Sequence, residues 1–545
     1  MRIVLPSGLH HVAALVVLVF FNIVLAGSTQ AGEPDFAAHL NRLSEFDFDI
    51  KEQAIKGMAA TDDERVDKVL RTLLNGDLFY RKSDKTIVYI KKTDDGYGLT
   101  SVLDNETLGT VSKRKIKKIG VNNRLRNVLS EIIAERGMNH RNPAIRLASV
   151  KEMIGNVGEA DRPKIQSLLG KERNEGVKRA LHIALAMIDV NSTDKKRQLA
   201  AVKALAESDY PESRNRLLTL FKAAKESDNT ELVSLANESL ARIKARAEHY
   251  RTVETIFFGV SLGSVLLLAA IGLAITFGVM GVINMAHGEL MMIGAYTTYV
   301  VQLLMPNHIE WSILVAIPAA FIVAGLFGVA IERGVIRFLY GRPLETLLAT
   351  FGISLVLQQL VRSIFSPLNR SVETPAWMSG SWEINALLSL TYNRMYIIVF
   401  SLLVFAALLL VLKKTPLGLQ VRAVSQNRNM ARAMGIRTEW VDAMTFGLGS
   451  GIAGVAGVAL SQLTNVGPNL GQSYIIDSFM VVVFGGVGNL WGTLVGAMSL
   501  GVANKFLEPS VGAVLAKILI LVFIILFIQK RPRGLFPQKG RAAEN

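Results

Sequence analysis

The sequence contains no cysteine. Disulfides, thiolate metal sites and cysteine nucleophiles are therefore excluded, and cysteine usage does not indicate a redox compartment. A P-loop, a zinc-ligand pair and a serine nucleophile elbow are also missing, and the lone histidines His140 and His182 show no metal-ligand spacing. The apolar half holds too few titratable groups for an ion-driven relay. We therefore expect no catalytic residue, no cofactor and no metal, so the protein is not predicted to be an enzyme.

Charge and hydropathy are unevenly distributed along the 545 residues. The sequence is charged and mixed up to about residue 250, whereas residues 253–528 consist of long apolar runs. Each run is near the ~20 residues that span a bilayer. The net charge is +15, and Lys and Arg of the apolar half concentrate in loops and the tail, which indicates membrane topology rather than nucleic-acid binding. We expect an all-α chain in which a polytopic membrane domain, residues 251–545, follows a polar domain, residues 32–250.

The N-terminus has the three parts of a secretory signal peptide, namely a charged start, an apolar run and a small-residue ending. Residues 1–31 are assigned to it, with cleavage expected after Ala26 or Ala31. The alternative is an uncleaved anchor. Both interpretations place the following domain outside the cytoplasm.

Residues 32–250 alternate short amphipathic helical patterns with polar turns. Units of roughly 30–40 residues resemble HEAT-type helix pairs, which bury their apolar faces by stacking. The pattern becomes β-rich between residues 79 and 111, where a turn at residues 94–96 predicts a β hairpin. The basic run Lys113–Lys118 is interpreted as a solvated helix face, with a binding patch as the alternative.

Loop charges predict the orientation of the membrane domain. The connection from Arg333 to Arg342, the loop from Lys413 to Arg437 and the tail from Lys530 are basic and should face the cytoplasm. The connection from Ser363 to Met395 should face outward. Counting the spans back from these loops places residue 250 outside, in agreement with the signal peptide.

Two segments of the apolar half align with each other at a constant offset. The aligned pairs are Phe277 with Phe484, Gly278 with Gly485, Gly281 with Gly488 and Gly294 with Gly501. Such internal repeats with interrupted helices are typical of transporters, and turning back at both Gly-rich breaks gives about nine crossings. The alternative has about eight crossings and one re-entrant piece, which would move one terminus to the other side.

The first break, residues 273–296, places polar side chains between two apolar runs. Lipid does not tolerate such groups, so they must be buried in protein, line a water-filled path or lie at an interface. Glycines allow close backbone approach and offer backbone carbonyls and amides to a polar solute. Of the side chains, Asn284 is expected to contribute to the path, whereas His287 and Glu289 are expected at the cytoplasmic turn. The translocation-path candidates are Gly278, Gly281, Asn284, His287, Glu289, Gly485, Gly488 and Asn489.

Residues 415–435 form part of a predicted cytoplasmic loop. A Pro–Gly turn starts the segment, and Gly435 ends a short amphipathic helix. Such a rigid knob suits the groove of a partner protein, with a plain connecting loop as the alternative. The residues assigned to this coupling loop are Thr415, Gly418, Arg422, Met430, Met434 and Gly435, and the apolar face is expected to present Val421 and Val424 together with the two methionines.

Together these motifs resemble the permease subunits of ABC importers for branched-chain amino acids and urea, over about residues 253–535. The resemblance implies a channel-forming subunit in the bacterial inner membrane. It would pair with a second homologous permease, sit on two cytoplasmic ATPases and receive substrate from a periplasmic binding protein. The long exported extension is similar to the extended urea-type permease B subunit, so urea is the expected substrate and branched-chain amino acids are the alternative.

One departure from the amino-acid type is Asn489-Leu490-Trp491, which stands in place of smaller Ser and Pro. A tryptophan there narrows the local space, which suits either a small solute or tighter packing.

A rival of another class is a membrane-anchored sensor with an external binding domain. Two matching polar interruptions argue against it, since a transmitter needs none. The predicted topology has a periplasmic N-terminal domain and a cytoplasmic C-terminus.

Overall fold

The computed structural model describes residues 33–61, 63–93 and 96–536, so the predicted signal segment at residues 1–31 lies outside the described residues. The chain divides into two compact units, one ending at Ile243 and the other beginning at Lys244. Both are mostly helical, as the sequence predicts. Helix α11 (Thr230–Met280) carries the chain from the first unit into the second.

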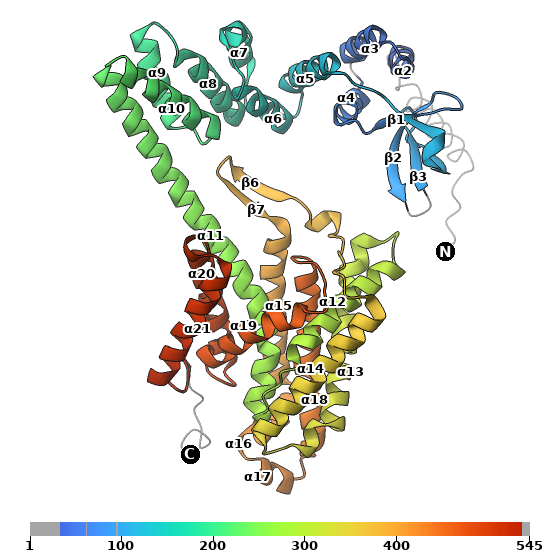
Figure 1. The fold of residues 1–545 in the computed structure, drawn as a ribbon, viewed down its shortest axis with the longest axis vertical. Coiled ribbons are helices and arrows are strands. Elements are labelled where there is room, and N and C mark those ends of the chain that lie inside the picture. The colour runs from blue at the N-terminus through green and yellow to red at the C-terminus, as the bar shows by residue number, and fades with distance from the viewer. Residues whose placement is uncertain (1–32, 62, 94–95, 537–545) are drawn as a thin grey trace, which may run out of the picture. The chain divides into compact units, whose positions relative to one another are not determined.

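The first unit begins with three helices and an antiparallel sheet (Figure 1). The helices are α2 (Glu33–Arg42), α3 (Phe48–Ala60) and α4 (Arg65–Asn75), and their buried apolar side chains share one core. Instead of a single hairpin, the sheet has five strands in the order β4-β3-β2-β1-β5, of which β2 and β3 span the predicted turn. The strands are β1 (Leu78–Arg81), β2 (Ile87–Thr93), β3 (Gly96–Ser101), β4 (Thr107–Val111) and β5 (Ile116–Lys118).

The basic run Lys113–Lys118 is not a helix face, and the prediction was wrong in this respect. It forms a 3-10 turn followed by the edge strand β5, which pairs with β1 and places Lys118 opposite Phe79. Ile116 is buried, whereas Lys117 and Lys118 are exposed. One apolar residue is too few to reveal a period of two in the sequence. Lysines on an edge strand oppose pairing with another chain.

Helix pairs make up the rest of the first unit (Figure 1). Their apolar faces form one continuous core that includes Ile165, Leu181 and Val202. Asn or Asp caps four of these helices at α5, α6, α8 and α9, where its side chain accepts a backbone N–H of the first turn. The helices are α5 (Asn123–Met138), α6 (Pro143–Ile154), α7 (Arg162–Lys171), α8 (Glu175–Asp189), α9 (Lys195–Ala206) and α10 (Pro211–Glu226).

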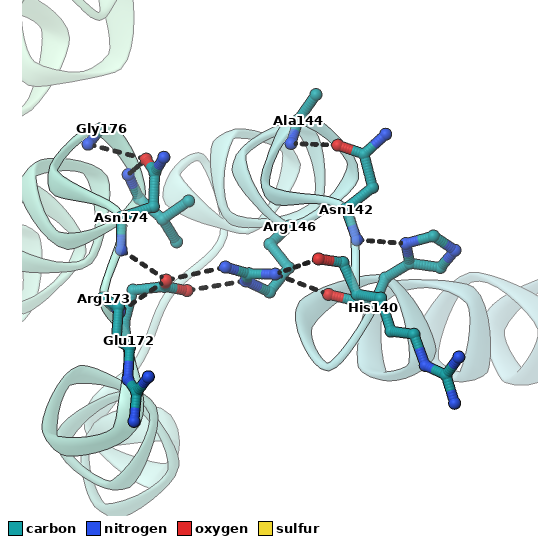
Figure 2. A network of polar contacts seen from close by, with 10 residues as sticks. His140, Asn142, Ala144, Arg146, Glu172, Arg173, Asn174 and Gly176 are labelled. Atoms are coloured by element: carbon teal, nitrogen blue, oxygen red, sulfur yellow. Dashed lines mark hydrogen bonds and ion pairs between the residues drawn. The ribbon is translucent and has the colours of Figure 1, made fainter.

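A polar network ties successive turns of the helix pairs together (Figure 2). The Arg146 guanidinium donates to the carbonyl of His140 at 2.7 Å and forms two bonds, 2.7 and 2.8 Å, to the carboxylate of Glu172. The same carboxylate accepts the backbone N–H of Asn174 at 2.8 Å. The hydrogen bonds from the Arg146 side chain, which have the largest effect, and those from backbone N–H groups lower the pKa of Glu172 from its ordinary 4.5 to about 2. The network therefore fixes one helix pair against the next.

The second unit contains the apolar helices. Within the described residues, six helices are long and apolar enough to cross a membrane, namely α11, α13, α14, α15, α18 and α21. A two-stranded sheet of β6 (Ser381–Asn385) and β7 (Leu388–Thr391) lies between α14 and α15. The helices after α11 are α12 (His287–Leu304), α13 (Ile309–Gly334), α14 (Pro343–Phe365), α15 (Tyr392–Lys414), α16 (Pro416–Gln426), α17 (Arg428–Ala433), α18 (Thr438–Ser461), α19 (Leu470–Gly485), α20 (Leu490–Val511) and α21 (Ala513–Lys530).

Helix α18 lies in the interior of the second unit and packs against α12 and α13. Its most apolar window is 89% buried, whereas those of α15 and α21 are only 22% and 17% buried. A methyl group at Gly454 would lie 2.5 Å from the Ala320 carbonyl of α13, and one at Gly457 would lie 2.0 Å from the Met291 carbonyl of α12. Small residues let membrane helices pack at such short range, so the glycines of α18 define the central layer.

The Glu172 network predicts a pH-dependent stability. Because the pKa is depressed in the folded state, the carboxylate contributes stability above its ordinary pKa of 4.5 and loses it as pH falls toward about 2. We expect Glu172→Gln to lower the stability of α6–α8 by about 1–2 kcal/mol at neutral pH. The difference from the native chain should vanish between pH 4.5 and 2. Hydrogen exchange of the α6–α8 amides in the full chain measures both effects.

The matched control is Glu175→Gln, which removes an exposed acid that pairs with Lys178 at 3.0 Å. Such a surface pair contributes little, so this variant should behave as the native chain does. Equal protection of α6–α8 in the Glu172 variant and the native chain at neutral pH would contradict the role given to the network.

Candidate functional site

The first break is a short non-helical segment between two helices. α11 ends at Met280 and α12 begins at His287, and Gly281 has a φ of +65°, which favours glycine. The backbone N–H of Met285 donates to the Thr350 hydroxyl of α14 at 3.1 Å. A neighbouring helix thus satisfies a backbone group that the interrupted helix leaves free, as membrane proteins require.

The three polar side chains of the first break are buried in protein, each at most 1% exposed. Asn284 accepts the backbone N–H of Ala286 at 3.0 Å. His287 donates from Nε2 to the Ala269 carbonyl of α11 at 2.8 Å. Glu289 accepts from both Ser354 and Gln358 of α14, at 3.1 and 2.7 Å. The structure therefore brings all three together at the start of α12.

Each of these side chains also keeps one buried polar atom that no described residue satisfies. The atoms are Nδ2 of Asn284, Nδ1 of His287 and Oε2 of Glu289. A buried donor or acceptor without a partner costs about 1–3 kcal/mol. Buried polar groups are nearly always hydrogen-bonded, so these three atoms are available to a water or a solute.

The second break joins α19 to α20, and Gly486 and Gly488 have φ values of +107° and +78°. Asn489 is the N-cap of α20, since its Oδ1 accepts the N–H of Gly492 at 3.1 Å. Its Nδ2 lies 3.3 Å from the Phe536 carbonyl of the C-terminal segment. Both ends of the Asn489 amide are thus engaged in holding this break.

The two breaks contact each other through glycines. A methyl group at Gly278 would lie 2.3 Å from the Cα of Gly488 in the second break, whereas one at Gly485 would lie 2.3 Å from the Gly492 carbonyl within the second break itself. Gly281 and Gly488, which the repeat aligns, both have a positive φ. The matching conformations agree with the internal repeat, and the contact leaves no room for a side chain at Gly278.

A polar stripe on α14 lies against the first break, and it was not predicted from the sequence. Its residues Thr346, Thr350, Ser354 and Gln358 recur at every fourth position and are each at most 5% exposed. Residues four apart share one face of a helix. This spacing was visible in the sequence as a hydrophilic face on an otherwise apolar helix, and it could have identified α14 as the partner of the break.

The coupling loop contains two short helices rather than one. Thr415 caps α16 by accepting the N–H of Gly418 at 3.3 Å, and Asn427 caps α17 by accepting the N–H of Met430 at 2.9 Å. A methyl group at Gly418 would lie 2.1 Å from the Leu412 carbonyl. Gly435 follows α17 with a φ of +86°, and Arg422 donates to the Leu412 carbonyl. These contacts fold the loop tightly onto the end of α15.

The apolar residues of this loop are exposed only in part, which differs from the expectation. Met430 and Met434 are 59% and 77% exposed, so they are accessible to a partner. Val421 and Val424 are buried against α18, so the sequence-based expectation that they join the methionines on one exposed face was wrong. The kink at Asn427 turns the two apolar sets in different directions, which a single-helix interpretation could not show.

A polytopic helical unit with two glycine breaks and a buried polar stripe defines a membrane permease. Residues 255–528 match the family described as "Branched-chain amino acid transport system / permease component", and the chain belongs to this family. Its members are transport permeases rather than enzymes. No solved structure matches the chain significantly.

Several curated proteins are similar to part of this chain. The high-affinity branched-chain amino acid transport system permease protein LivH of Escherichia coli K12 is 31% identical over 293 residues, which are 52% of this chain and 94% of that protein. BraD of Pseudomonas aeruginosa, with the same description, is 30% identical over 53% of this chain and 96% of its own length. The ribose import permease protein RbsC of Haemophilus influenzae is 30% identical over 23% of this chain and 42% of its own.

The contact between the breaks predicts a selective effect of Gly278→Ala. The added methyl group meets backbone rather than a flexible side chain, so the two breaks must separate. Overpacking of this kind costs about 1–3 kcal/mol. We expect a lower melting temperature of the purified full chain in detergent.

Gly352→Ala is the matched control, because a methyl group there meets nothing within 4 Å and alanine favours the helix α14. It should leave the melting temperature unchanged or slightly raised. If both variants melted at the same temperature, the contact between the breaks would not be structurally important.

Proposed function

We propose that this chain is the transmembrane permease subunit of an ABC importer for urea. The observation that carries the proposal of a path for a polar solute is the uncharged polar stripe of α14, whose hydroxyl and amide groups lie against the first break. Urea is a neutral solute with several donors and acceptors. A path with hydrogen-bond partners offsets part of its desolvation and still permits release. The free Nδ2 of Asn284 and Oε2 of Glu289 supply one donor and one acceptor beside the stripe.

Branched-chain amino acids are the second candidate substrates. They are favoured by the similarity to LivH, a branched-chain amino acid transport permease that is 31% identical to this chain over 94% of its own length. The preference for urea rests on the additional first unit, which lies outside the family match at residues 255–528 and resembles the extension of urea-type permeases.

The family supports a set of partners for the proposed subunit. These are a second homologous permease, two cytoplasmic ATPases and a periplasmic substrate-binding protein, assembled in the bacterial inner membrane. The first unit, residues 32–250, is proposed as a periplasmic HEAT-like domain behind a signal peptide at residues 1–31, with the C-terminus in the cytoplasm. The helix pairs and the Arg146–Glu172 network support the HEAT-like assignment, because they join successive pairs in one stack.

Uptake measurements test the substrate. Cells that contain the chain and its partners should accumulate labelled urea, and cells without the chain should not. Labelled leucine serves as the competing substrate in the same cells. Uptake of leucine alone would overturn the urea proposal, while ATP-dependent flux of neither solute in reconstituted vesicles would favour a membrane-anchored sensor instead.

The exposed methionines of the coupling loop predict the effect of Met434→Asp. Met434 is 77% exposed, so a charge there leaves the membrane fold intact. An interface anchor that is lost costs about 2 kcal/mol or more, and an unpaired buried charge adds to this. We expect normal expression, loss of the copurifying ATPase and loss of transport.

The control for this variant is Ser381→Asp, a change at an exposed position in β6. It should retain both the ATPase and transport-stimulated ATP hydrolysis. A Met434 variant that kept both at the level of this control would show that the loop does not dock the ATPase.

A further inference from the structure

Arg428 joins the coupling loop to the central helix of the membrane unit. It is the first residue of α17, and its guanidinium forms an ion pair with the carboxylate of Asp442 on α18. The second nitrogen, Nη1, lies 3.4 Å from the other carboxylate oxygen. The Asp442 side chain is 1% exposed, so the ion pair is buried at its acidic end.

A third element holds the same guanidinium. The Cζ of Arg428 lies 4.0 Å from the ring centroid of Tyr340, which precedes α14. A cation over an aromatic face is attracted by the ring, most strongly where water is excluded. Arg428 therefore connects α17, α18 and the start of α14, the helix that bears the polar stripe.

Apolar contacts run parallel to this ion pair. Val421 and Val424 of α16 share a buried cluster with Val441 of α18, and Val279 packs against the same cluster. Val279 is the penultimate residue of α11 and belongs to the first break. The inner side of the loop thus reaches both the central helix and the break.

Separating the ion pair costs more free energy than shifting the side chains of the apolar cluster. Separating Arg428 from Asp442 would leave a carboxylate unpaired in the apolar unit, which is strongly unfavourable. Val side chains can exchange neighbours at smaller cost. Displacement of α17 by a partner must therefore carry α18 with it, while α16 is free to adjust.

We propose that Arg428 is a positioning residue that transmits movement of the coupling loop to α18 and α14, and thereby to the path. The inference rests on the proposed importer function. It concerns the ratio of solute moved to ATP hydrolysed, rather than the docking of the ATPase, because the docking surface is on the opposite, exposed side of the loop at Met430 and Met434.

The test compares Asp442→Asn and the double variant Arg428→Ala with Asp442→Asn in the full importer. Both variants replace the Asp442 carboxylate by a neutral amide. Neither therefore leaves an unpaired buried carboxylate, which would destabilise the fold. We expect both to copurify with the ATPase and to hydrolyse ATP, with uptake per ATP hydrolysed lowered about tenfold. Arg428→Lys keeps a cation opposite Asp442, so its uptake per ATP hydrolysed should lie between that of the native importer and that of the double variant. A merely structural role would lower protein yield and melting temperature without changing this ratio.

Arg437→Ala is the matched control, since it removes another arginine of the same cytoplasmic segment and should leave the ratio unchanged. A native importer that transports, together with double-variant importers that keep the native ratio, would overturn this inference alone. A native importer that shows no ATP-dependent uptake would overturn the proposed function, and the inference with it.

Discussion

The backbone contact between Gly278 and Gly488 is the constraint on which the second unit depends. Two interrupted helices each leave backbone groups without intrahelical partners, and lipid offers none. Placing the breaks in contact removes both from lipid at once. A methyl group added at Gly278 would lie only 2.3 Å from the Gly488 Cα, so this arrangement requires glycine. The Thr350 hydroxyl of α14 accepts the backbone N–H of Met285, so α14 satisfies a further backbone group of the first break.

The same requirement explains the burial of the helices around the breaks. α12 carries His287 and Glu289 in its first turn, directly after Asn284, and packs against α13, α14, α18 and α19. α18 supplies small residues and α14 supplies polar ones. The outer helices α15 and α21 expose Leu403, Leu410 and Leu526, which suits a lipid environment where apolar side chains are the least costly. Polarity therefore decreases outward from the breaks.

The sequence predicts those features that repeat or break a pattern. The glycines at 281 and 488 were found because the copies align, and both have the same backbone conformation. The ion pair of Arg428 was not predicted, because nothing in the sequence indicates that its partner is Asp442 on the next helix. The five-stranded sheet was underestimated because β5 pairs with β1 across many residues and offers one buried position, Ile116. Period and spacing are local signals, whereas pairing between distant elements depends on the three-dimensional fold.

The coupling loop has an inner side fixed to the break and an outer side open to a partner, and this arrangement has a thermodynamic consequence. Val279 ties the inner side to the end of α11, while Met430 and Met434 remain exposed on the outer side. If the loop docks a partner and the break carries a solute, as proposed, a partner that shifts the loop changes the free energy of the solute at the break. By linkage, a solute at the break changes the affinity of the loop for the partner by the same factor. A tightly folded loop with glycine at 418 and 435 serves this purpose, because a flexible one would absorb the displacement within itself.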